Sequence, residues 1–108
     1  MLSLVTCKAL AEKYPEVRER RLRSCELFQT EHRNGVSRHY WCPRTGDLLE
    51  IARNTGEAFS LVSDPANTAN WGHPWTFHFD FDVAGEAEQF FADDTSEAAV
   101  AAWLLARK

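Results

Sequence analysis

The clearest alternation of apolar and polar residues along the chain lies between positions 75 and 82. The apolar positions are Trp75, Phe77, Phe79 and Phe81, and the polar positions are Thr76, His78, Asp80 and Asp82. Because successive side chains of a strand point to opposite faces, this pattern predicts a strand whose apolar face lies on the core.

Turn signals recur before this strand at intervals typical of a β-meander. Asn34-Gly35, Thr45-Gly46 and Thr55-Gly56 lie about ten residues apart, and each follows a polar residue. The segments around them predict strands at 25–31, 36–42, 48–53 and 57–63. A further strand is expected at 86–92. Between these elements, the Pro-, Asn- and Gly-rich segment 64–74 predicts a long loop.

Helical spacing is strongest near the end of the sequence. Val100, Trp103 and Leu104 fall at i, i+3 and i+4, and Asp94 with Glu97 three residues later resembles a capping box. These features predict a helix over about 96–106, with Asp94 as its N-cap.

The first residues also have helical spacing, at Leu4, Cys7, Leu10 and Ala11. Pro15 interrupts this pattern, because the residue before a proline avoids the α region, but Pro15 can itself begin a second short helix. The choice between one helix and two stays open.

Together these elements predict one α+β domain over residues 1–108. An antiparallel sheet of five or six strands in a meander is expected, with an N-terminal helix or helix pair and a C-terminal helix packed on one face. A chain of 108 residues that is 44% hydrophobic can bury a core without a metal or disulfide. The absence of a long apolar run and of a basic leader leads us to expect a cytoplasmic protein with no membrane contact.

The three cysteines, Cys7, Cys25 and Cys42, show no Cys-x-x-Cys spacing. An odd number without paired spacing argues against a disulfide framework. We therefore expect reduced thiols that are mostly buried as small core residues.

Charge changes the picture most, because it is segregated along the sequence. Residues 1–53 carry ten Lys and Arg against seven Asp and Glu, whereas 54–108 carry two against nine. Seven of those carboxylates lie in one stretch without Lys or Arg: Asp80, Asp82, Glu86, Glu88, Asp93, Asp94 and Glu97. Such asymmetry steers encounters with partners of opposite charge.

This acidic stretch, together with a nearby aromatic residue, is the candidate partner-binding site. Its members are Asp80, Asp82, Glu86, Glu88, Trp71 and His78. Tryptophan is enriched at binding hot spots, and Trp71 would share a surface with the acidic strand if its ring is exposed.

The leading hypothesis is therefore a non-enzymatic module that docks a partner protein with a basic surface. If that basic surface holds DNA or RNA, the module acts as an inhibitor of a nucleic-acid-processing protein. In small size, acidic patch and lack of a catalytic motif, the chain resembles small accessory proteins of phages, although no motif carries the likeness. No catalytic residue, metal or other cofactor is expected.

Two other classes stay open at this point. A small enzyme would use a metal on His78, Asp80 and Asp82, or the Cys42 thiol with His39. Zinc on His32, His39 and Cys42 is disfavoured, because only one pair has short spacing.

A nucleic-acid binder would use the arginines between 18 and 44, namely Arg18, Arg20, Arg21, Arg23, Arg33, Arg38 and Arg44. Interleaved glutamates and an isoelectric point near 5.5 argue against direct nucleic-acid binding. Homodimerisation through the oppositely charged halves also stays open.

Overall fold

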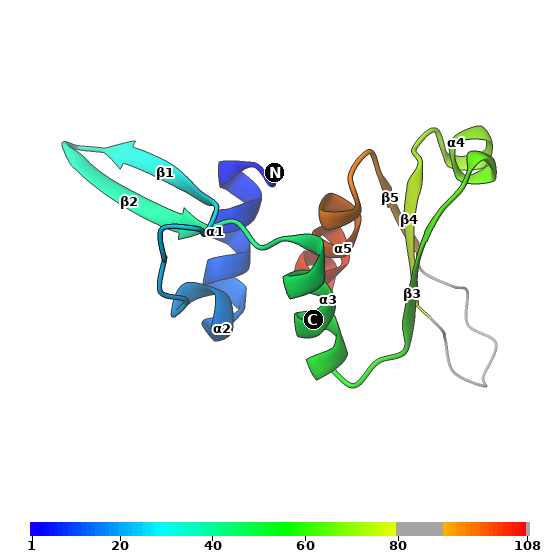
Figure 1. Ribbon diagram of the computed structural model, residues 1–108, viewed down its shortest axis with the longest axis horizontal. Coiled ribbons are helices and arrows are strands. Elements are labelled where there is room, and N and C mark those ends of the chain that lie inside the picture. Colours follow the sequence, from blue (N-terminus) through cyan, green and yellow to red (C-terminus); the bar gives the residue numbers. More distant parts are fainter. Residues whose placement is uncertain (80–89, 108) are drawn as a thin grey trace. The chain divides into compact units, whose positions relative to one another are not determined.

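The computed structural model describes residues 1–79 and 90–107 (Figure 1). The chain groups into two compact units, called here unit 1, Met1–Arg44, and unit 2, Thr45–Lys108. Each unit has its own helices and antiparallel strands, which confirms the α+β class. This grouping does not decide whether the units fold together, so the single domain expected for 1–108 stays a prediction.

Unit 1 begins with the helix pair that Pro15 made possible. Helix α1 spans Leu4–Lys13, and the Ser3 hydroxyl caps it by accepting the Thr6 backbone N–H at 3.2 Å. Tyr14 leaves the helical conformation before the proline, as the steric rule requires, and α2 spans Pro15–Arg18. The open choice is thus settled in favour of two helices.

A β-hairpin completes unit 1. Strand β1 spans Phe28–Arg33 and β2 spans Val36–Trp41, in antiparallel register from Phe28 opposite Trp41 to Arg33 opposite Val36. Asn34 and Gly35 both have positive φ, 53° and 75°, which is the conformation of the two-residue type I′ turn. The predicted hairpin is confirmed, although its first strand begins three residues later than expected.

The core of unit 1 lies between its helices and its hairpin. The buried apolar residues are Leu2, Cys7, Leu10, Ala11, Tyr14, Val17, Trp41 and Cys42. The Trp41 indole N–H reaches the edge of this core and donates to Glu26 Oε2 at 3.0 Å.

Unit 2 is built on a three-stranded antiparallel sheet in the order β3-β4-β5. The strands are β3, Phe59–Ser63, β4, Trp75–Phe79, and β5, Phe90–Asp93. The strand predicted from the alternating pattern is confirmed over 75–79, and its continuation to 82 lies outside the described residues. The strand expected at 86–92 is observed as β5, within the described part of that segment.

Phe77 is the centre of the unit 2 core. Its ring centroid lies 5.1 Å from that of Phe59 on the neighbouring strand and 5.5 Å from that of Trp103 on α5. Helix α5, Ser96–Ala106, therefore covers this face of the sheet (Figure 1).

The bounds of α5 match the predicted helix. Its buried residues include the expected stripe of Val100, Trp103 and Leu104, which is therefore confirmed. The N-cap prediction was wrong by one residue, because the hydroxyl of Thr95, and not Asp94, accepts the backbone N–H of Ala98 at 3.2 Å.

The predicted strand at 48–53 was wrong, because these residues belong to helix α3, Thr45–Asn54. Leu48, Ile51 and Ala52 are its buried residues, and they fall at i, i+3 and i+4. The short apolar run is compatible with either element by pattern alone, and the helical stripe is the one that the fold buries.

The predicted loop at 64–74 was also wrong, because it contains helix α4, Pro65–Trp71. The Asp64 carboxylate caps its start by accepting the Asn67 N–H at 3.0 Å, and Pro65 occupies the first turn. Gly72, at φ 76°, ends it in the left-handed conformation. Residues that are common in loops here mark the two ends of a helix.

Helix α3 explains why the described strands do not form the expected five- or six-stranded meander. Helix α3 separates β2 from β3 in sequence, so the described strands form one two-stranded and one three-stranded sheet. No helix in the described ranges is long and apolar enough to cross a membrane.

Asn67 fastens α4 to the sheet of unit 2. Its amide Nδ2 donates to the Val62 carbonyl at 2.9 Å and to the Pro74 carbonyl at 3.0 Å, and the residue is only 7% exposed. One side chain thus satisfies carbonyl groups on both segments that flank the helix.

We expect Asn67→Ala to lower the free energy of unfolding by about 1–3 kcal/mol, because two carbonyl groups lose their side-chain donor. Urea denaturation measures the effect. Asn70→Ala, an exposed change on the same helix, is the matched control and should leave stability nearly unchanged. Equal effects of the two changes would contradict an anchoring role for Asn67.

Candidate functional site

The segregation of charge becomes sharper when it is counted by structural unit. Unit 1 carries nine Lys and Arg against five Asp and Glu, a net of +4, and unit 2 carries three against eleven, a net of −8. The boundary between the units therefore coincides with the change of sign. Each unit is a separate candidate for binding a partner of opposite charge.

One candidate surface is a corner of unit 2, called here the acidic corner and made of Trp71, His73, Asp93 and Asp94. After the turn at Gly72, His73 Nδ1 lies 2.7 Å from Asp94 Oδ1. The Asp93 carboxylate accepts the backbone N–H of Asp94 at 2.7 Å. These contacts hold the segment after α4 against the turn between β5 and α5.

The acidic corner exposes both an aromatic ring and a carboxylate. Trp71 is 44% exposed, and the Asp94 side chain is 77% exposed even though it contacts His73. Trp71 is therefore exposed, as a role in docking requires. Trp71 lies two residues before His73, and His73 contacts Asp94, so the exposed aromatic residue and the exposed carboxylate are linked through His73.

The structure brings one predicted site residue, Trp71, to this corner. Asp80, Asp82, Glu86 and Glu88, in the connection from β4 to β5, lie outside the described residues, so their arrangement stays a prediction. His78 lies on β4, and its backbone is paired opposite Ser60 on β3 and Phe90 on β5. The metal site hypothesised from His78, Asp80 and Asp82 likewise stays untested.

The histidines considered for zinc have other neighbours in the hairpin. His32 Nδ1 lies 2.8 Å from Ser37 Oγ, and His39 Nδ1 lies 2.8 Å from Thr30 Oγ1. Among the residues that the structure describes, no group of three or more His, Cys, Asp and Glu side chains is placed to hold a metal ion.

Cys42, the candidate nucleophile, is buried in unit 1 beside a second cysteine. It is 1% exposed, and its Sγ lies 2.9 Å from the Sγ of Cys7. A thiol buried to this extent does not present a nucleophile to solvent. The expected burial is confirmed for Cys7 and Cys42, whereas Cys25 is exposed.

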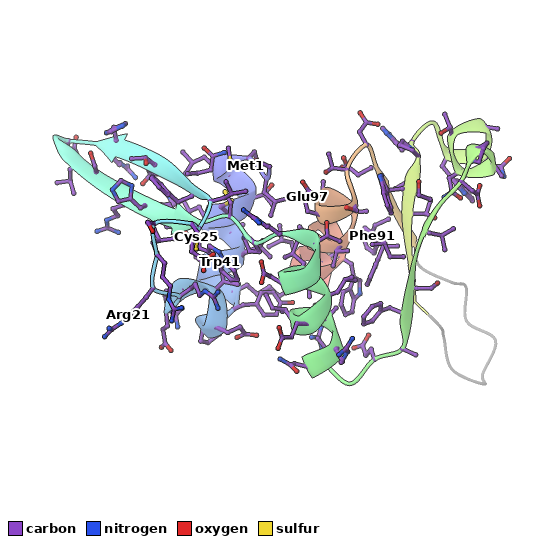
Figure 2. The ribbon with its side chains drawn as sticks, in the orientation of Figure 1. Met1, Arg21, Cys25, Trp41, Phe91 and Glu97 are labelled. Atoms are coloured by element: carbon purple, nitrogen blue, oxygen red, sulfur yellow. The ribbon has the colours of Figure 1, made fainter. Side chains whose placement is uncertain are left out.

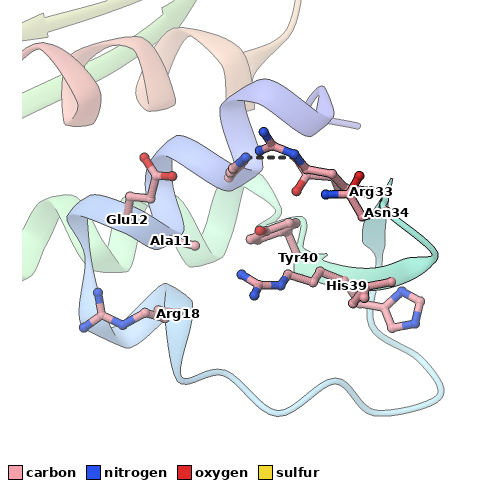
Figure 3. A pocket seen from close by; sticks show the side chains of 11 residues that line it. Ala11, Glu12, Arg18, Arg33, Asn34, His39 and Tyr40 are labelled. Carbon is pink, nitrogen blue, oxygen red and sulfur yellow. Dashed lines mark hydrogen bonds and ion pairs between the residues drawn. The ribbon is translucent and has the colours of Figure 1, made fainter.

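The second candidate surface lies in unit 1, between α1, α2 and the hairpin. This basic groove has a volume of about 880 Å³ (Figure 3). Its charged lining residues are Lys8, Arg18, Arg33, Arg38, Glu12 and Glu31, with His39 and Tyr40 beside them. Positive charge exceeds negative charge in this lining, so the groove favours an anionic group.

One ion pair links the helical and hairpin sides of the basic groove. Lys8 Nζ donates to Glu31 Oε2 at 2.9 Å, which connects α1 to β1. This hydrogen bond holds the pKa of the Glu31 carboxyl below its ordinary value and raises the pKa of the Lys8 ammonium. Two of the groove's charges are thus already partly neutralised by each other.

One arginine of the cluster after α2, Arg20, makes contacts within unit 1. Arg20 donates to Glu26 Oε1 at 2.9 Å, and its guanidinium lies 4.6 Å from the centroid of the Trp41 ring. The hydrogen bond from Arg20 holds the pKa of Glu26 below its ordinary value. Arg21, in contrast, extends away from the ribbon (Figure 2). Local ion pairing thus accounts for part of this cluster, as the interleaved glutamates suggested.

No family model, curated protein or solved structure matches the chain. Its function is therefore argued from these surfaces alone, because fold by itself does not define function.

Three pairings at or near these surfaces were missed by sequence reasoning: Lys8 with Glu31, His73 with Asp94, and Cys7 with Cys42. Their members lie 23, 21 and 35 positions apart, and no local pattern joins them. The opposite charges of Lys8 and Glu31 allow them to pair, but the sequence allows many other pairs of oppositely charged residues equally well.

We expect Lys8→Met to raise the pKa of Glu31 toward its ordinary value of 4.5, because the carboxylate loses the cation that stabilises it. A carboxyl NMR titration measures this pKa directly. Lys13→Met, a change at the last residue of the same helix, is the control and should leave the Glu31 pKa in place.

The same pair predicts a pH dependence of stability. The folded-state pKa of Glu31 lies below its unfolded value, so its contribution is present above pH 4.5 and is lost as the pH falls through the folded-state pKa. Lys8→Met should therefore lose less stability than the wild type over that acid range, as measured by urea denaturation. An unchanged pKa and identical pH profiles would contradict the ion pair.

Proposed function

We propose that the protein is a non-enzymatic protein-interaction module that docks on a partner protein with a basic surface. The docking surface, called here the acidic face, consists of the acidic corner of unit 2 together with Asp80, Asp82, Glu86 and Glu88. The observation that carries the proposal is the exposed Trp71, which lies two residues before His73, the residue that contacts the exposed Asp94 carboxylate. The net charge of −8 in unit 2 supports it.

The two features supply different parts of recognition. Complementary charge raises the rate of encounter and suppresses partners of the wrong sign, whereas it adds less to net affinity. A tryptophan ring buries a large area at a small cost in conformational entropy, and tryptophans are enriched among residues that dominate binding energy. The acidic residues therefore select the partner, and Trp71 anchors it.

The partner's basic surface is the kind that binds a phosphate backbone. If it does so, the docked module competes with DNA or RNA and inhibits a nucleic-acid-processing protein. This role agrees with the resemblance in general style to small phage accessory proteins.

A pull-down from a nuclease-treated lysate of the source organism tests the acidic face. Wild type is compared with Asp80→Lys/Asp82→Lys by mass spectrometry, after circular dichroism has shown that both fold. Glu16→Lys/Glu50→Lys changes net charge by the same amount at two exposed positions elsewhere. We expect a partner that wild type and this control retain and that the Asp80/Asp82 variant loses. Equal retention by all three proteins would rule out docking through the acidic face.

The isolated partner then allows the role of Trp71 to be measured. We expect Trp71→Ala to raise the dissociation constant about 30-fold, which is the effect of losing a hot-spot residue. Phe28→Ala is a matched control, because Phe28 is 47% exposed and lies in unit 1. Calorimetry that gives the two variants the same affinity as wild type would contradict an anchoring role for Trp71.

A second candidate function, nucleic-acid binding, is favoured by one observation, the cationic lining of the basic groove. Binding of this kind should weaken steeply with salt and be lost in Arg33→Glu/Arg38→Glu. Fluorescence anisotropy with labelled single-stranded and duplex DNA and RNA distinguishes the two candidates. The acidic-face proposal predicts no measurable affinity for any of these probes.

A further inference from the structure

Two cysteines that are distant in sequence meet in the core of unit 1. Cys7 lies on α1, and Cys42 follows the last residue of β2, 35 positions later. Their sulfur atoms are 2.9 Å apart, and the residues are 0% and 1% exposed. The contact therefore joins the helical part of the unit to the hairpin.

The surroundings of the two sulfurs keep them together. The Leu2 carbonyl oxygen lies 3.9 Å from the Cys7 Sγ and 3.7 Å from the Cys42 Sγ. The same oxygen accepts a hydrogen bond from the Gln29 side-chain amide at 2.9 Å, which fixes its position. Both thiols therefore share one acceptor, the Leu2 carbonyl, which lies beside the sulfur pair.

The separation is close to that of a covalent bond. A disulfide has an S–S distance of about 2.05 Å, so the two sulfurs need to approach by only about 0.9 Å. Thiols that merely fill a core have no requirement to face each other at this distance.

We propose that Cys7 and Cys42 form a reversible disulfide bond when the protein meets a peroxide, so that unit 1 contains an oxidative modification site. The bond ties α1 to the end of β2 and covalently closes the core of the unit. Because both residues lie in unit 1, the proposal does not depend on the docking function of unit 2.

The reaction balances with hydrogen peroxide as the two-electron oxidant. One cysteine, as its thiolate, attacks a peroxide oxygen, the O–O bond breaks, and a sulfenic acid and one water result. The second thiol then attacks that sulfur, the S–O bond breaks, and a second water leaves. Two thiols are oxidised to one disulfide, and one peroxide is reduced to two waters.

Burial of the two thiols makes their oxidation by peroxide slow. Removal from water, together with the neighbouring Cys42 thiol, raises the pKa of the Cys7 thiol, so little thiolate is present in the closed unit. The first step therefore requires local opening, whereas Cys25 is exposed and is accessible without it. Cys25 must be removed before the buried pair can be studied alone.

The test uses the Cys25→Ser protein over residues 1–108, in which only the two buried cysteines remain. Because Cys25 is exposed, this change should leave the fold intact. After incubation with hydrogen peroxide, we expect a monomer that has lost two hydrogen atoms, no reaction with maleimide after unfolding, and a peptide linking Cys7 to Cys42. Dithiothreitol should restore both thiols.

The disulfide should also raise the thermal midpoint of the protein. Crosslinking residues 35 positions apart restricts the unfolded chain, and we expect an increase on the order of 10 °C that dithiothreitol reverses. Cys7→Ser/Cys25→Ser and Cys25→Ser/Cys42→Ser, each with one remaining thiol, are the controls and should show no such increase after peroxide treatment.

Two results would overturn the proposal. The first is that both thiols remain free at a peroxide concentration that oxidises the same protein in urea. The second is that oxidation gives sulfinic acids or linked dimers in place of the intramolecular bond. Since the Cys25→Ser protein keeps both buried residues, neither result can be attributed to a damaged core.

Discussion

The packing of a helix against a short antiparallel sheet is the interaction on which both units depend. A two-stranded hairpin is marginally stable in water, so β1 and β2 need the apolar face of α1 and α2 to persist. The three strands of unit 2 need α5 in the same way, and the contact of Phe77 with Trp103 lies at the centre of that face. The remaining features are attached to these two small cores.

Because each core is small, much of the chain lies at the surface, where charge is tolerated at little cost. The two units carry net charges of opposite sign, +4 on unit 1 and −8 on unit 2. In unit 1, ion pairs within the unit, such as Lys8 with Glu31, neutralise part of the charge. In unit 2, where eleven acidic residues face three basic ones, internal pairing can neutralise only a minority of the carboxylates.

The candidate sites differ in how they are positioned. The acidic corner depends on a local turn and on strand pairing: Gly72 ends α4 in the left-handed conformation just before His73, and the pairing of β4 with β5 brings Asp94 near His73. The thiol pair of unit 1 is assembled by packing, because Cys7 and Cys42 meet only when α1 lies on the hairpin. A surface defined by turns can change without loss of the core, whereas the thiol pair is part of the core.

Local signals were sufficient to predict α5, the first residues of β4, the break at Pro15 and the hairpin turn at Asn34-Gly35, because periodicity, caps and turn residues act within a few positions. They also identified Trp71 and the acidic stretch as candidates for binding. They misassigned α3 and α4, where short apolar runs and turn-forming residues suit more than one element. Only the tertiary structure decided the division of strands between two sheets, the exposure of Trp71 and the contact of Cys7 with Cys42, because burial and pairing depend on segments that are far apart in the chain.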